Sequence, residues 1–206
     1  QLVNHASRIR NRSRGRFHAP LTVRIPYSGG IRALEHHSES PETYFVHTPG
    51  LTVVVPSGPY DAKGLLASSI RSNDPVIYLE PKRIYRAIKE EVPEEEYTIP
   101  IGKAKVVQSG GDITVVTYGA MLKNVREAAE KVGEKYSVEV LDLRSLSPLD
   151  TDAIIKSVKK TGRCVIVHEA QRTLGMAAEI IARINEKALL SLEAPVERVT
   201  GYDVVY

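Results

Sequence analysis

The chain has 206 residues, of which 42% are hydrophobic and 26% are charged, and this balance excludes a disordered or collagen-like protein. The formal net charge of +3 is small, and the sequence holds no apolar run of the ~20 residues that a membrane-spanning helix requires. Cys164 is the single cysteine, which excludes an internal disulfide and a multi-cysteine metal site. We therefore expect a soluble protein of one large or two small domains, in a reducing, cytoplasmic setting and without a membrane partner.

Arginines crowd the first sixteen residues. They are Arg8, Arg10, Arg12, Arg14 and Arg16. No aromatic residues are interleaved with them and no nucleic-acid-binding signature accompanies them, so we predict a solvated or interface-facing helix end and no nucleic-acid partner. The chain starts at Gln1 directly in a helix-like pattern and stops at Tyr206 without a terminating signal. We expect both ends to continue in a longer protein.

Short runs of β-branched residues bounded by proline or glycine predict buried strands. In chain order, these strands cover residues 21–25, 51–55, 76–79, 113–118, 138–143, 164–167 and 196–199. A 3.6-residue apolar period predicts helices over residues 61–70, 122–132 and 153–158, the last with Asp150 or Thr151 as N-cap and Gly162 as C-cap. Residues 105–113 predict a strand, a glycine turn and another strand. Strands that alternate with helices predict an α/β fold with a mainly parallel sheet.

The composition changes between Pro81 and Pro100, where residues 89–96 are charged, bounded by proline and without an apolar period. We interpret this stretch as the linker between two α/β domains, with the second domain beginning near Tyr97. The alternative is a solvated loop inside a single domain.

The most unusual segment is residues 31–42, which follows a predicted strand and a glycine turn. It carries adjacent histidines, His36 and His37, beside Ser38 and two acidic residues, in the kind of loop where parallel sheets place ligands. Histidine exchanges a proton most readily near neutral pH, so this loop is a candidate proton-transfer site. A loop of ordinary polar residues is the alternative. A zinc site is less favoured, because neighbouring histidines do not share a face and no third ligand follows at a usual spacing.

Other familiar catalytic patterns are absent. The sequence has no phosphate-binding P-loop, no G-x-S-x-G nucleophile elbow and no G-x-G-x-x-G after a strand. Lys63 could suggest a catalytic lysine, but the acidic first turn around it indicates a simple helix start. Cys164 begins an apolar strand and is interpreted as inert core. His168 and Glu169 close that strand and are interpreted as structural packing, with an interface or ligand role as the alternative.

Eight segments, in the same order along the chain, resemble the beta subunit of pyruvate and branched-chain 2-oxoacid dehydrogenases. They are residues 37–42, 47–51, 59–66, 74–82, 141–146, 160–163, 168–170 and 192–195. The resemblance implies two transketolase-like α/β domains. Residues 1–82 would be the later part of a pyrimidine-binding domain, residues 83–97 a linker, and residues 98–206 a transketolase C-terminal domain. The glutamate that activates thiamine diphosphate in this family would precede Gln1.

The resemblance also implies an activity. The chain would act in oxidative decarboxylation of a 2-oxoacid, either pyruvate or a branched-chain one, with reductive acylation of the lipoyl group on an acyltransferase core. Thiamine diphosphate and its magnesium would be held mainly by an alpha subunit in an alpha-two beta-two heterotetramer, in the cytoplasm or, in a eukaryote, the mitochondrial matrix. His37 would face the thiazolium ring as the catalytic residue that orients the 2-oxoacid and handles protons, with His36 secondary.

Some members of the resembled family bind a structural potassium ion. The corresponding positions here are Leu21, Thr22, Ser69, Ser72 and Asp74, of which Ser72 and Asp74 replace the usual Asp and Asn. Backbone carbonyls could contribute to such a site. Two alternatives to the enzymatic role stay open: a non-catalytic assembly subunit, and another enzyme of the transketolase superfamily.

Overall fold

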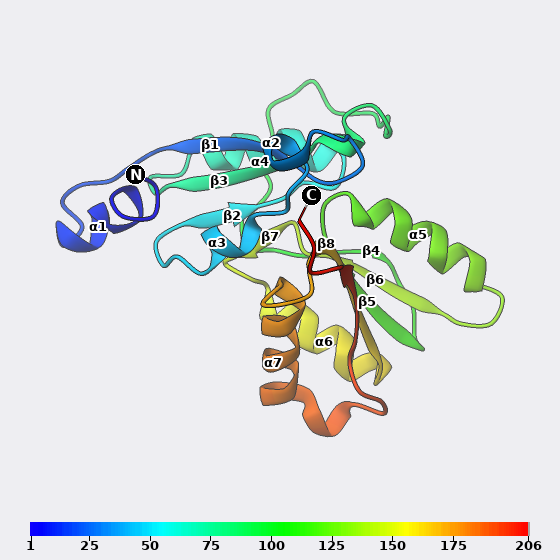
Figure 1. Cartoon of the computed structure of the whole chain (residues 1–206). Helices are drawn as coiled ribbons and strands as arrows, with labels where there is room; N and C mark the ends of the chain where they lie inside the picture. The colour runs from blue at the N-terminus through cyan, green and yellow to red at the C-terminus, as the bar shows by residue number, and fades with distance from the viewer. Residues whose placement is uncertain (206) are drawn as a thin grey trace.

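The computed structural model describes residues 1–205 and shows two β-sheets with helices on their faces (Figure 1). The first sheet has the strand order β1-β3-β2-β7 and the second the order β4-β6-β5-β8-β9. The first comprises β1 (Thr22–Tyr27), β2 (Thr52–Val54), β3 (Val76–Pro81) and β7 (Ser145–Ser147). The second comprises β4 (Lys105–Gln108), β5 (Ile113–Thr117), β6 (Val138–Asp142), β8 (Cys164–Gln171) and β9 (Glu197–Gly201). All seven predicted strands are present, and the predicted α/β fold class is confirmed.

Strand β3 lies at the centre of the first sheet, with β1 and β2 parallel to it on either side. All six residues of β3 are buried, as expected for a parallel strand that is covered on both faces. Strand β7 was not predicted, and it pairs antiparallel with β2 although it lies in the second half of the chain. The second half therefore supplies an edge strand to the first sheet.

Helix α4 (Pro59–Ile70) is the one long helix of the first half, close to its predicted range. Pro59 occupies the start of the helix, where its missing N–H costs no hydrogen bond, and Leu65 packs against Val54 and Tyr78. The other helices of this half are short. They are η1 (Ala6–Arg8), α1 (Ile9–Arg12), α2 (Leu34–His37), α3 (Glu42–Val46) and η2 (Lys82–Ile84). The helical pattern predicted near Gln1 corresponds to η1 and α1.

In the second sheet, β6, β5, β8 and β9 run parallel, and β4 is added antiparallel to β6. The strand, glycine turn and strand predicted over residues 105–113 are present, but β4 and β5 are not neighbours. The backbone of Gly110 passes close to the start of β6, where a Cβ on this glycine would lie 2.2 Å from the carbonyl carbon of Val138. The amides of Gly111 and Asp112 both donate to the Ser137 carbonyl. This contact carries the turn across β6, which is inserted between β4 and β5.

Helix α5 (Met121–Val132) packs on one face of the second sheet, and α6 (Thr151–Thr161) and α7 (Met176–Ala188) pack on the other (Figure 1). Successive strand residues alternate between faces, so Val115 lies toward α5 and Val116 toward α6 and α7. The predicted caps of α6 are confirmed: Asp150 accepts a hydrogen bond from the Ala153 amide, and Gly162 has φ of +68°. A short η3 (Leu189–Ser191) follows α7. Neither α7 nor η3 was predicted.

The two sheets share one hydrophobic core. Tyr27, Val53 and Leu79 of the first sheet belong to the same buried cluster as Leu141 and Ile166 of the second. The two predicted domains therefore stabilise each other, because neither sheet's inner face is buried by its own helices alone.

The predicted linker, residues 83–97, begins within η2, and the chain then holds neither helix nor strand between residues 85 and 104. It nevertheless packs on α4: Tyr97 stacks on Tyr60 with ring centroids 4.6 Å apart, and Lys63 Nζ donates to the Glu94 and Glu95 carbonyls at 3.0 and 2.9 Å. Lys63 thus has a structural role. The domain limits at residues 82 and 97 stay predictions. Across residues 1–205 we find no helix that is both long and apolar enough to cross a bilayer.

Candidate functional site

The carboxyl ends of strands from both sheets meet in a region that we call the seam. It contains Tyr27, Ser28, Tyr118, His168 and Glu169. Ser28, which follows β1, donates through Oγ to Glu169 Oε2 of β8 at 2.6 Å. The Tyr27 hydroxyl approaches Gly119 so closely that a Cβ there would lie 2.5 Å from it. Because α/β sheets bind ligands at the carboxyl ends of their parallel strands, the seam is the candidate functional site.

His37 ends helix α2 in the segment that joins β1 to β2. Three non-glycine residues of this segment, Ser28, Arg32 and Leu34, have positive φ of +93°, +56° and +43°. Such strain is concentrated at functional sites. His37 is half-buried, and its Nδ1 is buried without a hydrogen-bond partner, whereas His36 is exposed and lies 3.6 Å from Glu35. The structure therefore distinguishes the two histidines, and the catalytic role of His37 stays a prediction.

Glu42, the first residue of α3, is fully buried. Its Oε1 accepts a hydrogen bond of 2.6 Å from the Tyr118 hydroxyl, and its Oε2 has no partner. Burial raises the pKa of Glu42, and the nearby Glu169 carboxylate raises it further. Burial also raises the pKa of Tyr118 well above its ordinary value, so this hydroxyl remains a donor. The pair therefore connects the chain just after His37 to the end of β5.

Glu169 makes a second connection at the seam. Besides Ser28, its carboxylate accepts from the Gly29 amide at 3.1 Å, and the Arg83 guanidinium lies 3.8 Å away. Burial raises the pKa of Glu169. His168 beside it is 2% exposed, neither ring nitrogen has a hydrogen-bond partner, and burial lowers its pKa to about 4. His168 is thus a neutral imidazole at physiological pH, with two polar atoms that nothing in residues 1–205 satisfies.

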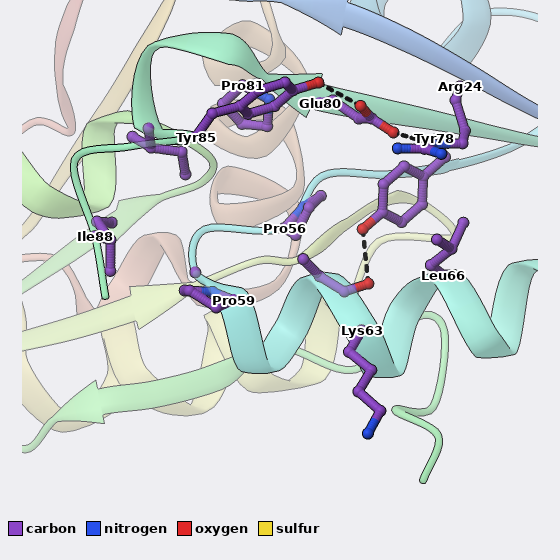
Figure 2. Close-up of a pocket in the computed structure, with 13 residues that line it drawn as sticks. Arg24, Pro56, Pro59, Lys63, Leu66, Tyr78, Glu80, Pro81, Tyr85 and Ile88 are labelled. Atoms are coloured by element: carbon purple, nitrogen blue, oxygen red, sulfur yellow. Dashed lines mark hydrogen bonds and ion pairs between the residues drawn. The ribbon is translucent and has the colours of Figure 1, made fainter. Parts of the chain in front are cut away.

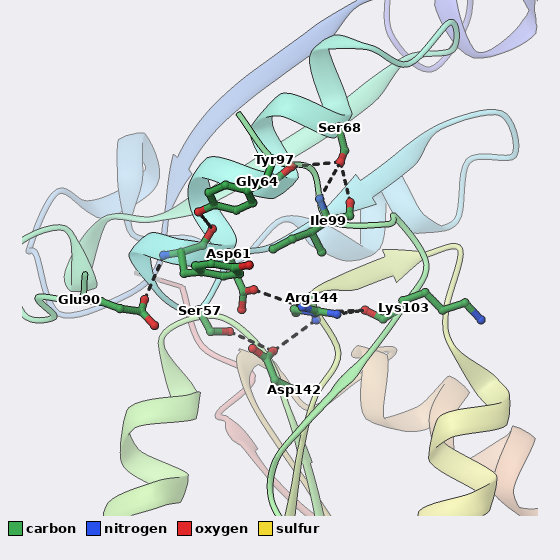
Figure 3. A network of polar contacts seen from close by, with 11 residues as sticks. Ser57, Asp61, Gly64, Ser68, Glu90, Tyr97, Ile99, Lys103, Asp142 and Arg144 are labelled. Carbon is green, nitrogen blue, oxygen red and sulfur yellow. Dashed lines mark hydrogen bonds and ion pairs between the residues drawn. The ribbon is translucent and has the colours of Figure 1, made fainter. Parts of the chain in front are cut away.

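A polar network lies beside the seam, between α4 and the second sheet (Figure 3). Asp142 ends β6 and is completely buried, and it accepts from Ser57 Oγ at 3.0 Å and from the Arg144 amide at 3.3 Å. Burial, and after it the Asp61 carboxylate, raises the pKa of Asp142 to about 7. The Arg144 guanidinium bonds Asp61 Oδ1 at 3.2 Å and the Lys103 carbonyl. These contacts fasten the start of α4 to the second sheet.

Of the residues predicted for potassium, Leu21, Thr22, Ser72 and Asp74 lie at or just before the amino-terminal ends of β1 and β3, at the far end of the first sheet from the seam, and Ser69 lies in the last turn of α4. Asp74, the only carboxylate among them, pairs with Arg10. Ser72 Oγ donates to the Asp74 carbonyl at 3.0 Å, and the Leu21 carbonyl accepts from the Val76 amide at 2.8 Å. This arrangement does not fit a cation, because Arg10 already neutralises the carboxylate. No cluster of three or more His, Cys, Asp or Glu side chains within residues 1–205 suits a metal ion either.

Two cavities lie away from His37. One of about 410 Å³ lies between α4 and the first sheet, where Tyr78 donates to the Ala62 carbonyl and Glu80 accepts from both Arg24 and Tyr85 (Figure 2). The other, of about 870 Å³, is an apolar hollow between α5 and the second sheet. Neither cavity is lined by His37 or by a residue of the seam.

Sequence reasoning placed His37 in a functional loop but gave Glu42 and Tyr118 no role, and it assigned Glu169 to packing. The available signals were local. Glu42 lies within the segment that carries His37, and Glu169 follows a histidine at the end of an apolar strand. What the sequence does not display is that these residues meet across gaps of 76 and 141 residues.

Comparison with known proteins agrees with this architecture. Residues 1–88 match the transketolase pyrimidine-binding domain, and residues 102–206 match the transketolase C-terminal domain. The "Pyruvate dehydrogenase E1 component subunit beta" of Acholeplasma laidlawii is 57% identical over 204 residues, covering 98% of this chain and 62% of that protein. The protein of the same name from Staphylococcus aureus strain Mu50 is 53% identical over 206 residues, covering 100% of this chain and 63% of that protein.

The chain therefore spans less than two thirds of the length of these relatives. A solved structure described as "Split gene transketolase, inactive beta4 tetramer" superimposes with a TM-score of 0.73 over 89% of this chain and 58% of that chain. At 23% identity this similarity concerns the fold alone. The two domain matches show that the chain belongs to the transketolase family, with a pyrimidine-binding domain followed by a transketolase C-terminal domain.

Proposed function

We propose that this chain forms part of the beta subunit of a 2-oxoacid dehydrogenase, in the component that decarboxylates the 2-oxoacid and acylates a lipoyl group. The observation that carries the proposal is the placement of His37. It lies half-buried in a strained segment at the carboxyl end of β1, with Nδ1 unpartnered, in a chain whose relatives are named as pyruvate dehydrogenase beta subunits. Those names favour pyruvate over a branched-chain 2-oxoacid.

Thiamine diphosphate is the cofactor that the proposal requires. When bound, it supplies the carbanion that adds to the keto carbon and allows carbon dioxide to leave. Unpartnered buried atoms near the seam, on His37, Ser40, Glu42 and His168, are suited to a polar ligand or partner. His37 can hold or release a proton at Nδ1 and can orient the carboxylate of the 2-oxoacid. Because Nδ1 is itself buried although the ring is half exposed, this atom is shielded from water.

The partners are those that the resemblance to the 2-oxoacid dehydrogenase beta subunits implies. They are an alpha subunit, which would hold the diphosphate and its magnesium in an alpha-two beta-two assembly, and a lipoyl acyltransferase core as the acyl acceptor. The sequence has no phosphate-binding loop, which is compatible with this division of roles. A cytoplasmic location is supported by the bacterial relatives.

The test is to co-express the full-length beta subunit with its alpha partner and to measure decarboxylation of pyruvate and of branched-chain 2-oxoacids. We expect His37→Ala to lower kcat by roughly 100-fold or more, as removal of an acid–base group does. His36→Ala is the matched control, because His36 is adjacent but exposed, and it should retain turnover. Unchanged turnover in His37→Ala would refute the site. Absence of both decarboxylation and cofactor binding in the intact wild-type complex would instead favour an assembly subunit.

A further inference from the structure

Both ends of the segment that carries His37 are held by the second sheet. We call residues 28–42 the His37 segment. At its start, Ser28 Oγ and the Gly29 amide donate to the two carboxylate oxygens of Glu169, at 2.6 and 3.1 Å. At its end, Glu42 accepts from the Tyr118 hydroxyl at 2.6 Å. Tyr118 and Glu169 lie at the carboxyl ends of β5 and β8, which are neighbouring parallel strands.

The His37 segment has little regular structure of its own. Helix α2 has four residues and α3 has five, far below the ~12 residues at which an isolated helix becomes marginally stable. Its internal hydrogen bonds include those from the Ala33 amide to Ser38 Oγ and from the Ser38 amide to the Leu34 carbonyl. Arg32 and Leu34 are held at positive φ, which is unfavourable for these residues. Contacts from outside the segment must therefore fix its conformation.

The two contacts from the second sheet are suited to that task. Tyr118 is 2% exposed and extends a buried strand, so its hydroxyl is fixed in position. Glu42 is fully buried and its second oxygen has no partner, so the Tyr118 hydroxyl is its only side-chain hydrogen-bond partner in residues 1–205. Loss of that bond would leave a buried carboxyl group unsatisfied, which is much more costly than loss of an exposed hydrogen bond. Glu169 binds two donors at once and so fixes the direction in which the segment leaves β1.

We infer that Tyr118 and Glu169 are positioning residues, through which the transketolase C-terminal domain holds the His37 segment in place for the reaction. This inference rests on the proposed function. Neither side chain needs to touch the substrate, because each acts through residues on either side of His37. A displacement of about 1 Å in a catalytic group can cost roughly 100-fold in rate, so the three hydrogen bonds that these two side chains make at the ends of the segment are enough to affect turnover.

The structure offers a matched control for the test. Tyr78 is 3% exposed, and its hydroxyl donates to the Ala62 carbonyl at 2.8 Å, so Tyr78→Phe also removes one buried tyrosine hydrogen bond. Tyr78 lies in β3 and does not contact the His37 segment by any of its hydrogen bonds. Tyr118→Phe and Glu169→Ala are the test variants. Glu169→Gln keeps one acceptor oxygen and should recover part of the loss.

Each variant is made in the full-length complex, and two quantities are measured. The first is steady-state decarboxylation, for which Tyr118→Phe and Glu169→Ala should lower kcat by roughly 10- to 100-fold with little change in KM, whereas Tyr78→Phe should not. The second is backbone hydrogen exchange of peptides covering residues 28–46, which needs no turnover. Exchange there should rise in Tyr118→Phe and Glu169→Ala and stay at the wild-type level in Tyr78→Phe.

Equal kcat and equal exchange in Tyr118→Phe and Tyr78→Phe would overturn the inference. If Tyr118→Phe does not assemble, the comparison of Glu169→Ala with Glu169→Gln decides in the same way, with recovery in the glutamine variant expected and no difference overturning it. An inactive wild-type complex would refute the proposed function, while the exchange measurement would still show whether the two residues hold the segment.

Discussion

Replacement of Asp142 by asparagine should change how the stability of the chain depends on pH. Asp142 is fully buried at the end of β6, and one of its oxygens has no hydrogen-bond partner. Burial, followed by the repulsion of Asp61, raises its pKa from 3.8 to about 7. Between these two pH values, the folded chain keeps a proton on Asp142 that the unfolded chain has already released.

The sign and size of the effect follow from this difference in proton binding. Since the folded state binds the additional proton, the free energy of unfolding decreases as pH rises from about 4 to about 7, and it levels off above that. At about 1.4 kcal/mol per pH unit, the rise from 3.8 to about 7 corresponds to roughly 4 kcal/mol of lost stability. Asparagine keeps an acceptor for Ser57 and carries no charge, so the variant should lack this decrease.

The assay is urea unfolding at pH 5, 6, 7 and 8 for wild type and Asp142→Asn. At pH 5 Asp142 is protonated in the folded chain but already largely ionised in the unfolded chain, so wild type has lost part of the stability there, and the advantage of the variant should grow further up to pH 8. Asp112→Asn provides the control, because Asp112 is an exposed aspartate that also accepts a backbone hydrogen bond. If the difference between wild type and Asp142→Asn is the same at pH 5 and pH 8, the reasoning about burial is wrong.

Three further predictions concern the fold and the cation. Gly50→Ala should destabilise the chain by roughly 1–3 kcal/mol in urea unfolding, because Gly50 has a φ of +90° and the new Cβ would lie 2.0 Å from the Ser7 carbonyl oxygen. Gly111→Ala is the control and should be tolerated sterically, because no atom lies within 4 Å of its new Cβ. Asp150→Ala should cost about 1 kcal/mol through loss of the α6 cap, and the same measurement on exposed Asp152→Ala should show less. Exchange of KCl for NaCl at equal ionic strength should leave Tm unchanged, because Arg10 neutralises Asp74, and a Tm raised specifically by potassium would contradict this.

The strands and the main helices could be predicted because their signals are local. Residues 76–79 are apolar over the whole strand, residues 138–143 alternate β-branched or leucine residues with two acids, and Asp150 with Gly162 marks both ends of α6. Helix α7 had an equally local signal in the spacing of Ala177, Ile180, Ile184 and Ala188, so it could have been predicted. By contrast, β7 has only three residues, and its strand conformation depends on pairing with β2, more than 90 residues earlier in the chain.

The candidate site was predictable only in part for the same reason. Sequence alone placed His37 in a loop after a strand, which is a local property. It could not show that Glu42 would be buried against Tyr118, or that Glu169 would bind Ser28 and Gly29, because these pairs are brought together by the packing of two sheets. The same limit applies to the positions predicted for potassium. Their correspondence with the resembled family can be read from short stretches of sequence, but the pairing of Asp74 with Arg10 depends on where α1 packs and cannot.

Cavity size and the positions of acids with raised pKa values indicate different regions of this molecule as the ligand site, and the acids are the better guide to it. The cavities of about 410 and 870 Å³ would be the default choice for a ligand site, but the larger is a mainly apolar hollow between α5 and the second sheet. The acids Glu42 and Asp142, which are fully buried, and Glu169, which is half-buried, instead gather at or beside the seam, each with a raised pKa. Burial of such acids lowers stability, and a chain selected for stability alone would have apolar side chains there. Such clusters are characteristic of functional sites, so the seam, whose residues hold both ends of the His37 segment, is where a substrate should be sought.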